Sequence, residues 1–392
     1  MRSVCLVCLL LILCCGAPAV AATDHYLFVT SWGGVGTDDS QFFNPIGIAV
    51  DAAGSTVYVA DTLNNRVQTF NASGGHIATW GEYGSDDGWL DSPHGIAVNP
   101  AGSTVYVVDT FNHRVQTFNG TGGHIATWGG NGTGDGEFWY PRGIAVNPAG
   151  STVYVADTNN NRVQVFTADG EHIATWGRNG TGDGQFASPS GIAVNAAGST
   201  IFVADTDNDR VQSFTANGEH VATWGRNGTG DGEFDYPWGI AVDTSGTVYV
   251  ADKGNHRIQT FTSTGRHIAT FGTYGSGDGQ FTDPMGVAVD STGKNVYVMD
   301  TNNHRVQEFA ANVSEPTPGV VAVPGGAGIP IDTNADGLYD DVSGNGRKDF
   351  SDIVLYFIQM GWISANEPVV SFDYNGNGRV DFADVVWLFM HL

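Results

Sequence analysis

The sequence predicts an all-β protein in which six blades of four strands each form a closed β-propeller. One observation is a motif, Pro-x-Gly-(Ile/Val)-Ala-Val, that occurs six times, beginning at Pro45, Pro93, Pro141, Pro189, Pro237 and Pro284. Successive copies begin 48, 48, 48, 48 and 47 residues apart, and periods in the forties are typical of propellers or solenoids. The other observation is that each copy continues with three more short alternating segments between Gly, Asn and Asp turns, which makes four strands per repeat.

The ends of the repeat region distinguish a closed ring from an open stack. The last copy ends after residues 305–309 and lacks a fourth strand, whereas an extra fourth strand at residues 28–33 precedes the first copy and matches residues 76–81. We expect this N-terminal strand to complete the sixth blade, because the pairing closes the ring and leaves no terminal repeat exposed. The propeller is therefore predicted to span residues 24–310.

The segment before the propeller has the pattern of a secretory signal peptide. Residues 1–22 contain one positive charge, Arg2, followed by the apolar run 4–13 and by small residues that end at Ala22. All four cysteines lie within this segment, so a disulfide is not expected in the rest of the chain. We expect a secreted protein that is extracellular or associated with the cell surface.

The composition argues against two classes of partner. The chain has 16 Lys and Arg residues against 41 Asp and Glu residues, a formal net charge of −25, so its surface should repel phosphate backbones and anionic membranes. No apolar stretch after the N-terminal segment approaches the ~20 residues of a membrane helix. We therefore expect neither nucleic acid as a partner nor a membrane span.

Residues that recur in every blade are expected to build the scaffold. The aromatic series of the second, third and fourth strands should pack between blades, and the recurring histidines should be structural, because equivalent positions around a ring are too far apart to share one metal ion. An Asp and an Arg flank each turn between the second and third strands and should form an ion pair that holds it. These pairs are Asp61/Arg66, Asp109/Arg114, Asp157/Arg162, Asp205/Arg210, Asp252/Arg257 and Asp300/Arg305.

The repeat motifs resemble those of a known family. Residues 154–157 read Tyr-Val-Ala-Asp and residues 160–166 read Asn-Asn-Arg-Val-Gln-Val-Phe, with Asn-His-Arg variants at 112–114, 255–257 and 303–305. These motifs resemble NHL repeats. The resemblance implies a six-bladed propeller that binds partners at one face, and NHL propellers include enzymes, RNA binders and protein-interaction domains.

Function is expected where the blades differ. The loops between second and third strands and those between blades open on the same face, and residues there form a mixed aromatic and polar surface suited to a protein or carbohydrate ligand. The alternative is that loop positions vary because they are unconstrained. The candidate ligand-binding residues are His94, Arg142, Trp238, Met285, Phe111, Trp139, Tyr140 and Tyr236.

The sequence provides little support for catalysis, and we predict no catalytic residue. The enzymes with which these motifs invite comparison are the NHL-type lyases, which hold metal ligands at the channel mouth. At that place this sequence has only His94 as a candidate ligand. There is no Gly-x-Ser-x-Gly elbow and no phosphate loop. A propeller lyase or hydrolase acting on an extracellular peptide or polysaccharide is the alternative to a binding protein, and a structural envelope protein is a second alternative.

The C-terminal region predicts calcium binding. Residues 311–331 form a Pro- and Gly-rich linker, and residues 332–392 contain two twelve-residue loops that place oxygen ligands at positions 1, 3, 5, 7, 9 and 12 around Ca²⁺, with Gly at position 6 for the turn. The first set is Asp341, Ser343, Asn345, Arg347 through its carbonyl, Asp349 and Asp352. The second set is Asp373, Asn375, Asn377, Arg379 through its carbonyl, Asp381 and Asp384. Upstream, a third site or merely an acidic linker contains Asp332, Asn334, Asp336 and Asp340.

Each calcium loop leads into an apolar segment, 353–358 and 385–390, that is predicted to be helical. Duplicated loops of this kind after a Pro-rich linker resemble dockerin type I domains. The resemblance implies calcium-dependent attachment to a cohesin-like domain on a scaffold or cell surface. The sequence departs from the dockerin pattern at loop positions 10 and 11, Phe350-Ser351 and Phe382-Ala383, so calcium binding is better supported than cohesin binding; the apolar helix faces could instead pack on each other.

Overall fold

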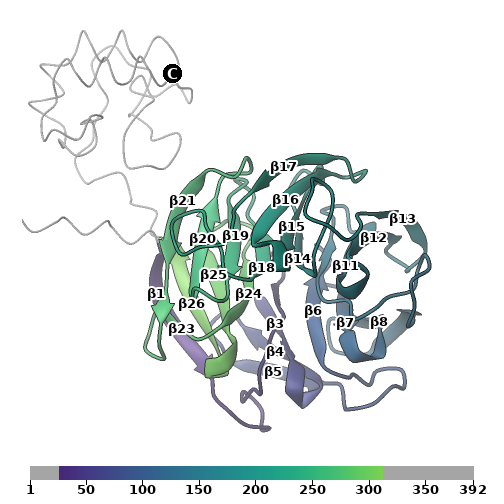
Figure 1. Ribbon diagram of the computed structural model, residues 1–392. Helices are drawn as coiled ribbons and strands as arrows, with labels where there is room; N and C mark the ends of the chain where they lie inside the picture. The colour runs from purple at the N-terminus through teal and green to yellow at the C-terminus, as the bar shows by residue number, and fades with distance from the viewer. Residues whose placement is uncertain (1–25, 312–392) are drawn as a thin grey trace, which may run out of the picture.

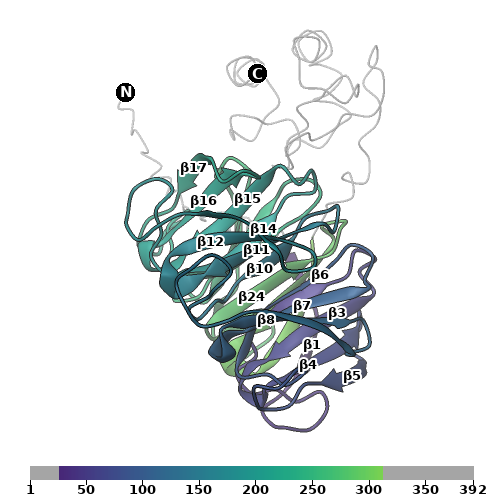
Figure 2. The same cartoon turned by 90° about the vertical axis from the view of Figure 1, so that its right-hand side faces the viewer.

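The six-bladed propeller is confirmed in the computed structural model, which describes residues 26–311 (Figures 1 and 2). Six four-stranded antiparallel sheets surround a central axis, and their innermost strands contact one another in the cyclic order β2, β6, β10, β14, β18, β24 and back to β2. The strand order within five blades follows the chain, as in β2-β3-β4-β5. The sixth blade has the order β1-β26-β25-β24.

Strands at equivalent positions have similar bounds in all blades. The innermost strands are β2 (Ile48–Val50), β6 (Pro93–Val98), β10 (Ile144–Val146), β14 (Pro189–Val194), β18 (Pro237–Val242) and β24 (Pro284–Val289). The second strands are β3 (Thr56–Asp61), β7 (Thr104–Asp109), β11 (Thr152–Asp157), β15 (Thr200–Asp205), β19 (Val248–Asp252) and β25 (Asn295–Asp300). The third strands are β4 (Arg66–Asn71), β8 (Arg114–Asn119), β12 (Arg162–Thr167), β16 (Arg210–Thr215), β20 (Arg257–Phe261) and β26 (Arg305–Ala311).

The outer strands and the short elements complete the described fold. The outer strands are β5 (His76–Trp80), β9 (His124–Gly129), β13 (His172–Trp176), β17 (His220–Trp224), β21 (His267–Phe271) and, in the sixth blade, β1 (Tyr26–Gly33). Single-turn 3-10 helices follow five of the second strands: η1 (Thr62–Asn64), η2 (Thr110–Asn112), η3 (Thr158–Asn160), η4 (Thr206–Asn208) and η5 (Thr301–Asn303). Two short parallel strands, β22 (Thr273–Tyr274) and β23 (Gln280–Phe281), lie in the loop before β24.

The chain closes the ring with its own N-terminal strand, as the sequence predicts. Strand β1 pairs antiparallel with β26, from Tyr26 opposite Ala311 to Gly33 opposite Arg305. Figure 1 shows this junction as the purple β1 beside the green β26. The sixth blade therefore has its full complement of strands, and β26 is hydrogen-bonded along both edges.

The hydrophobic core lies between blades rather than within them. One cluster joins Val57, Val59 and Phe70 of the first blade to Tyr297 and Met299 of the sixth, all with no more than trace exposure. Equivalent clusters fill the other junctions of the ring. The recurring aromatic residues thus pack between blades as predicted, and each blade depends on its neighbours for burial of its apolar side chains.

Blades meet most closely at the axis, through the glycine of the Pro-x-Gly motif. A Cβ atom on Gly95 would collide with the carbonyl oxygen of Arg142 in the next blade, and one on Gly191 would collide with that of Trp238. The same contact joins Gly286 of the last blade to Ile46 of the first. Only glycine permits this approach, so the residue before each glycine is held at the channel wall at a fixed position.

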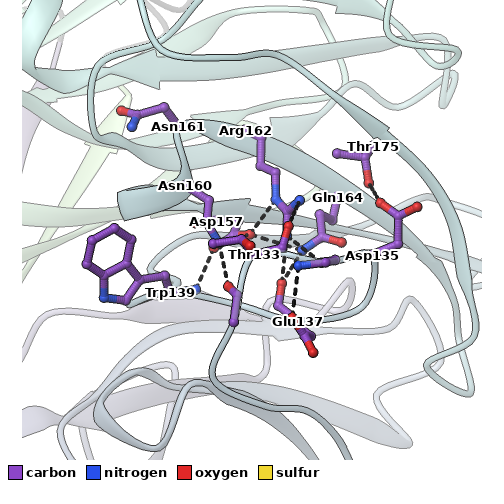
Figure 3. A network of polar contacts seen from close by, with 12 residues as sticks. Thr133, Asp135, Glu137, Trp139, Asp157, Asn160, Asn161, Arg162, Gln164 and Thr175 are labelled. Atoms are coloured by element: carbon purple, nitrogen blue, oxygen red, sulfur yellow. Dashed lines mark hydrogen bonds and ion pairs between the residues drawn. The ribbon is translucent and has the colours of Figure 1, made fainter.

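A buried carboxylate organises the turn between the second and third strands of each blade, as Figure 3 shows for the third blade. Asp157 accepts hydrogen bonds from Arg162 Nε at 2.7 Å, Gln164 Nε2 at 3.0 Å and the backbone N–H of Trp139 at 2.8 Å. The Asp–Arg ion pair recurs in all six blades with distances of 2.6 or 2.7 Å. The predicted ion pairs are confirmed.

Each of these arginines also binds the loop that leads into its blade. The Arg162 guanidinium donates to the carbonyls of Thr133, Gly134 and Glu137 at 2.8, 2.7 and 2.8 Å. Together with the bond to Asp157, these contacts leave the guanidinium almost fully hydrogen-bonded, with 11% of the side chain exposed. The charge of these residues is therefore committed to the scaffold.

The recurring histidines have structural contacts. Nδ1 of His113 accepts a hydrogen bond at 3.0 Å from the backbone N–H of Tyr140 in the loop to the next blade, and His256 and His304 do the same. The outer-strand histidines hydrogen-bond a threonine in their own strand, as His172 Nε2 does with Thr175 Oγ1 at 2.8 Å. Both series of histidines therefore help to hold loops in place. In residues 26–311, no three His, Cys, Asp or Glu side chains lie close enough together to hold a metal ion.

We predict that Asp157→Asn lowers the free energy of unfolding by ~3–5 kcal/mol, because it leaves the Arg162 charge buried without its carboxylate. The matched control is Arg226→Gln, which breaks an Arg–Glu233 pair of the same 2.7 Å length whose arginine is 80% exposed. Such an exposed pair should contribute at most about 1 kcal/mol. Urea unfolding followed by tryptophan fluorescence measures both, and equal losses for the two variants would contradict this account.

A second prediction concerns Glu308, which is buried in β26 where three other blades have threonine. Burial, and then the charge of Asp290, raise the pKa of this carboxyl. A carboxyl with a raised pKa in the folded state binds its proton more tightly there, so its contribution to stability is lost as the pH rises above the unfolded value of about 4.3. Glu308→Thr should therefore gain stability relative to the wild type between pH 4 and pH 8; parallel profiles of melting temperature against pH would refute the prediction.

Candidate ligand-binding site at the channel mouth

The six residues between Pro and Gly of the repeat motif surround one mouth of the central channel. Pro93 pairs with Asp109, so this mouth lies at the end of the blades where the turns between second and third strands open. The cavity there is small, about 80 Å³, and its walls are the glycine and the isoleucine or valine that follow each variable residue. The variable residues are Ile46, His94, Arg142, Ser190, Trp238 and Met285.

Two cations and one indole dominate the chemistry of this mouth. The guanidinium carbon of Arg142 lies 4.6 Å from the ring centroid of Trp238, and Nζ of Lys253 lies 5.2 Å from the same centroid. Both distances are within the range of cation–π attraction. The ring of Trp238 therefore contacts two positively charged groups in a strongly acidic protein.

Arg142 differs from the six scaffold arginines in having no carboxylate in direct contact with its charge among the described residues. Within residues 26–311 its guanidinium takes part in no ion pair within 4 Å and its buried Nε has no hydrogen-bond partner. Burial lowers its pKa, and the charge of Asp207 acts in the opposite direction. The Asp207 carboxylate instead accepts a hydrogen bond of 2.6 Å from Ser188 Oγ. An arginine remains protonated under these conditions, so the mouth carries a positive charge that no carboxylate contacts directly among the described residues.

His94 contributes a neutral polar ring beside these cations. Burial, and then the charge of Arg142, lower the pKa of His94 to about 3. The imidazole is therefore uncharged at neutral pH, and one ring nitrogen carries a hydrogen that it can donate. Its Nδ1 is buried without a hydrogen-bond partner among the described residues.

Sequence analysis missed Lys253, although the repeat contains the signal that identifies it. In the other five blades this position is threonine, and in four of them the hydroxyl donates to a proline carbonyl of the next blade, as Thr206 does to Pro237 at 2.8 Å. The fifth blade has Lys253 there and forms a plain turn where the others have a 3-10 helix. A departure from a position that is otherwise constant indicates a role other than blade packing.

The structure separates the predicted binding face into two groups. His94, Arg142, Trp238 and Met285 come together at the channel mouth. The remaining predicted residues lie on the loops around it, where Phe111, Trp139 and Tyr236 are 50%, 45% and 51% exposed.

Only part of the outer group forms a cluster. The rings of Phe111 and Tyr140 are in edge contact at 5.2 Å, and Tyr140 also contacts His113 at 4.4 Å. Tyr236 belongs to a different loop, where its backbone N–H donates to Asp209 at 2.9 Å. We call the Phe111–Tyr140 pair the aromatic patch; it joins the second and third blades.

The loops of the fourth to sixth blades give the same face a different character. Carboxylates occur there on the turns and on the segments that lead into the blades. These residues are Asp207, Asp209, Asp235 and Asp283. The cationic mouth is therefore bordered by the aromatic patch in one sector and by an acidic arc in another.

Comparison with known proteins identifies the repeats. The family model for the NHL repeat matches residues 90–118, 138–166, 234–261 and 281–309. The chain therefore carries NHL repeats, which match in four of the six blades of its β-propeller. No curated protein is significantly similar to the chain.

Solved structures show the same fold at low sequence identity. A protein of unknown function from Bacteroides thetaiotaomicron is 18% identical, with a TM-score of 0.54 over 72% of this chain and 76% of its own. Hydrazine synthase from Kuenenia stuttgartiensis is 15% identical, with a TM-score of 0.51 over 71% of this chain and 99% of its own. A chain of a nidogen/laminin complex is 19% identical, with a TM-score of 0.49 over 62% of this chain and 84% of its own. The similarities to the first two structures concern the fold alone.

The remaining predicted sites lie outside the described residues. They comprise the N-terminal segment, the linker, both calcium loops with the upstream acidic residues, and the two C-terminal helices. In the described part of the chain, no helix is both long and apolar enough to cross a membrane.

The lowered pKa of His94 predicts how the stability of the folded protein changes as the pH falls. Because its pKa in the folded state is about 3 and that of an unfolded histidine is about 6.5, the unfolded chain takes up the proton first and stability falls as the pH drops between these values. His94→Met, which copies the residue of the sixth blade, should lose less unfolding free energy between pH 7 and pH 4 than the wild type. His172→Gln on β13 is the control, and urea titrations at several pH values are the measurement. A profile for His94→Met that follows the wild type would show that the residue is not buried in its neutral form.

Proposed function

We propose that this protein is a secreted binding protein without enzymatic activity. Its propeller binds a protein or carbohydrate ligand at the channel mouth, and its C-terminal region attaches it, with calcium, to an extracellular scaffold or cell surface. The observation that carries the proposal is that Arg142, Trp238 and Lys253 depart from their counterparts in the other blades and meet at one point.

The arrangement supports binding because it is costly to the fold. Lys253 gives up the threonine-to-proline hydrogen bond that links blades elsewhere, and it places an ammonium against the indole ring that also contacts a guanidinium. Groups that weaken a scaffold in this way are typical of functional sites, where stability and activity compete. NHL propellers are compatible with a protein-binding role, and exposed aromatic side chains are common in such surfaces.

The attachment part of the proposal rests on the two C-terminal loops. Their spacing of oxygen-bearing residues with glycine at position 6 is that of calcium loops, and the apolar segments after them would form the core of a small domain once calcium is bound. The acidic propeller would then be held at an outer surface by a calcium-dependent contact.

Lys253→Thr tests the propeller site by introducing the residue that the other five blades have at this position. The new hydroxyl should donate to the Pro284 carbonyl, so we expect unchanged or slightly increased stability, by about 0.5–1.5 kcal/mol for one hydrogen bond. Binding should weaken at the same time. The measurement is capture of partners from the producer's culture fluid and envelope by the full chain and by this variant, in the presence of a chelator so that the proposed calcium-dependent attachment does not contribute, with Arg178→Gln as the control. Equal capture of the same partner by all three proteins would refute a binding role for the mouth.

Asp341→Ala combined with Asp373→Ala tests the attachment. The wild-type chain should bind calcium in a calorimetric titration and should release at least one envelope partner when a chelator is added; the double variant should neither bind calcium nor capture that partner. Asp135→Ala, in a propeller loop, is the control for the loss of an acidic residue outside the predicted calcium loops. Capture of the same set of envelope partners with and without chelator, by the wild type and the double variant alike, would exclude calcium-dependent attachment.

A further inference from the structure

We propose that the channel mouth binds a single carboxylate, the C-terminal carboxylate of a polypeptide partner. The inference rests on the proposed binding function and specifies the chemistry of the ligand. Arg142, Lys253 and His94 would hold the carboxylate, and the aromatic patch would receive an apolar side chain near the end of the partner.

The first argument is charge. Six arginines of this protein are committed to carboxylates and loop carbonyls in the blades. Arg142 and Lys253 instead approach one indole ring, and neither takes part in an ion pair within 4 Å among the described residues. Partly buried charges that no carboxylate contacts directly are costly, and an anion bound at the mouth would offset that cost.

The second argument is the shape and polarity of the cavity. A cavity of about 80 Å³ with glycine and aliphatic walls admits one small group rather than a folded surface. A planar carboxylate matches the paired N–H donors of a guanidinium. His94, which is neutral at the working pH, can add a hydrogen bond without adding charge. The unpartnered nitrogens, Nε of Arg142 and Nδ1 of His94 in the tautomer that carries its hydrogen there, are donors that a carboxylate would satisfy.

The third argument distinguishes a chain terminus from a polyanion. The net charge of −25 and the acidic arc around the mouth would repel a polymer with a carboxylate or phosphate on every unit. A polypeptide terminus brings one carboxylate, and its last side chains can be apolar. Phe111 is half exposed beside Tyr140 on the same face and offers such side chains a contact surface.

The experiment is a selection with the full-length protein from a random heptapeptide library that ends in free carboxylates, in parallel with the same library extended by a fixed C-terminal tag. Enriched peptides are then synthesised with a free C-terminus and as C-terminal amides, and affinities are measured by quenching of tryptophan fluorescence and by calorimetry. We expect enrichment only with free termini and at least tenfold weaker binding of the amides. Arg142→Gln and Lys253→Thr should each weaken the free acid and leave the residual binding of the amide unchanged, while Arg178→Gln binds as the wild type does.

Other outcomes overturn the inference and separate it from the proposed function. Peptides that bind equally well as amides would show a binding face without carboxylate recognition. Arg142-dependent binding of oligogalacturonate in the absence of any enriched peptide would assign the mouth to an acidic glycan. Enrichment from neither library, together with partner capture that still depends on Lys253, would retain the binding function and exclude a chain terminus as its ligand.

Discussion

The close contact of neighbouring blades at the axis is the constraint on which the rest of the structure depends. Each Pro-x-Gly glycine lies against a backbone carbonyl of the next blade, and no side chain fits between them. Six such contacts must close on themselves, so the position of every blade is fixed by the other five. The inter-blade core then fills the space that this spacing leaves.

The same constraint explains how a repetitive scaffold can carry a specific site. The backbone around the channel is nearly invariant from blade to blade, so a side chain placed before the glycine has a determined position and direction. Variation at these positions therefore changes the chemistry of the mouth without disturbing the ring. The blades supply a constant backbone. The six variable residues, together with Lys253 beside them, determine which chemical groups the mouth presents to a ligand.

Sequence reasoning succeeds where the information lies within one repeat. The spacing of Asp157 and Arg162 across one turn predicts their ion pair, and the extra strand at the N-terminus predicts the ring closure. It fails for relations across the axis. Nothing in a linear period states that Arg142 and Lys253, which belong to blades two positions apart, share the ring of Trp238. Lys253 can be recognised in the sequence only as an exception at a position where the other five blades have threonine. The separation of the mouth from the aromatic patch depends on three-dimensional distances, which the sequence does not give.

The direction of β26 has a consequence for how the protein would be held. This strand runs from Arg305, at the end of the blade where the channel mouth lies, to Ala311 at the opposite end, where it is paired with Tyr26. Ala311 therefore lies on the face opposite the mouth, and a tether attached there would pull from that face. Because β26 is bonded to β25 on one side and β1 on the other, a pull on that tether would load two ladders in shear along their length rather than peel one edge strand away.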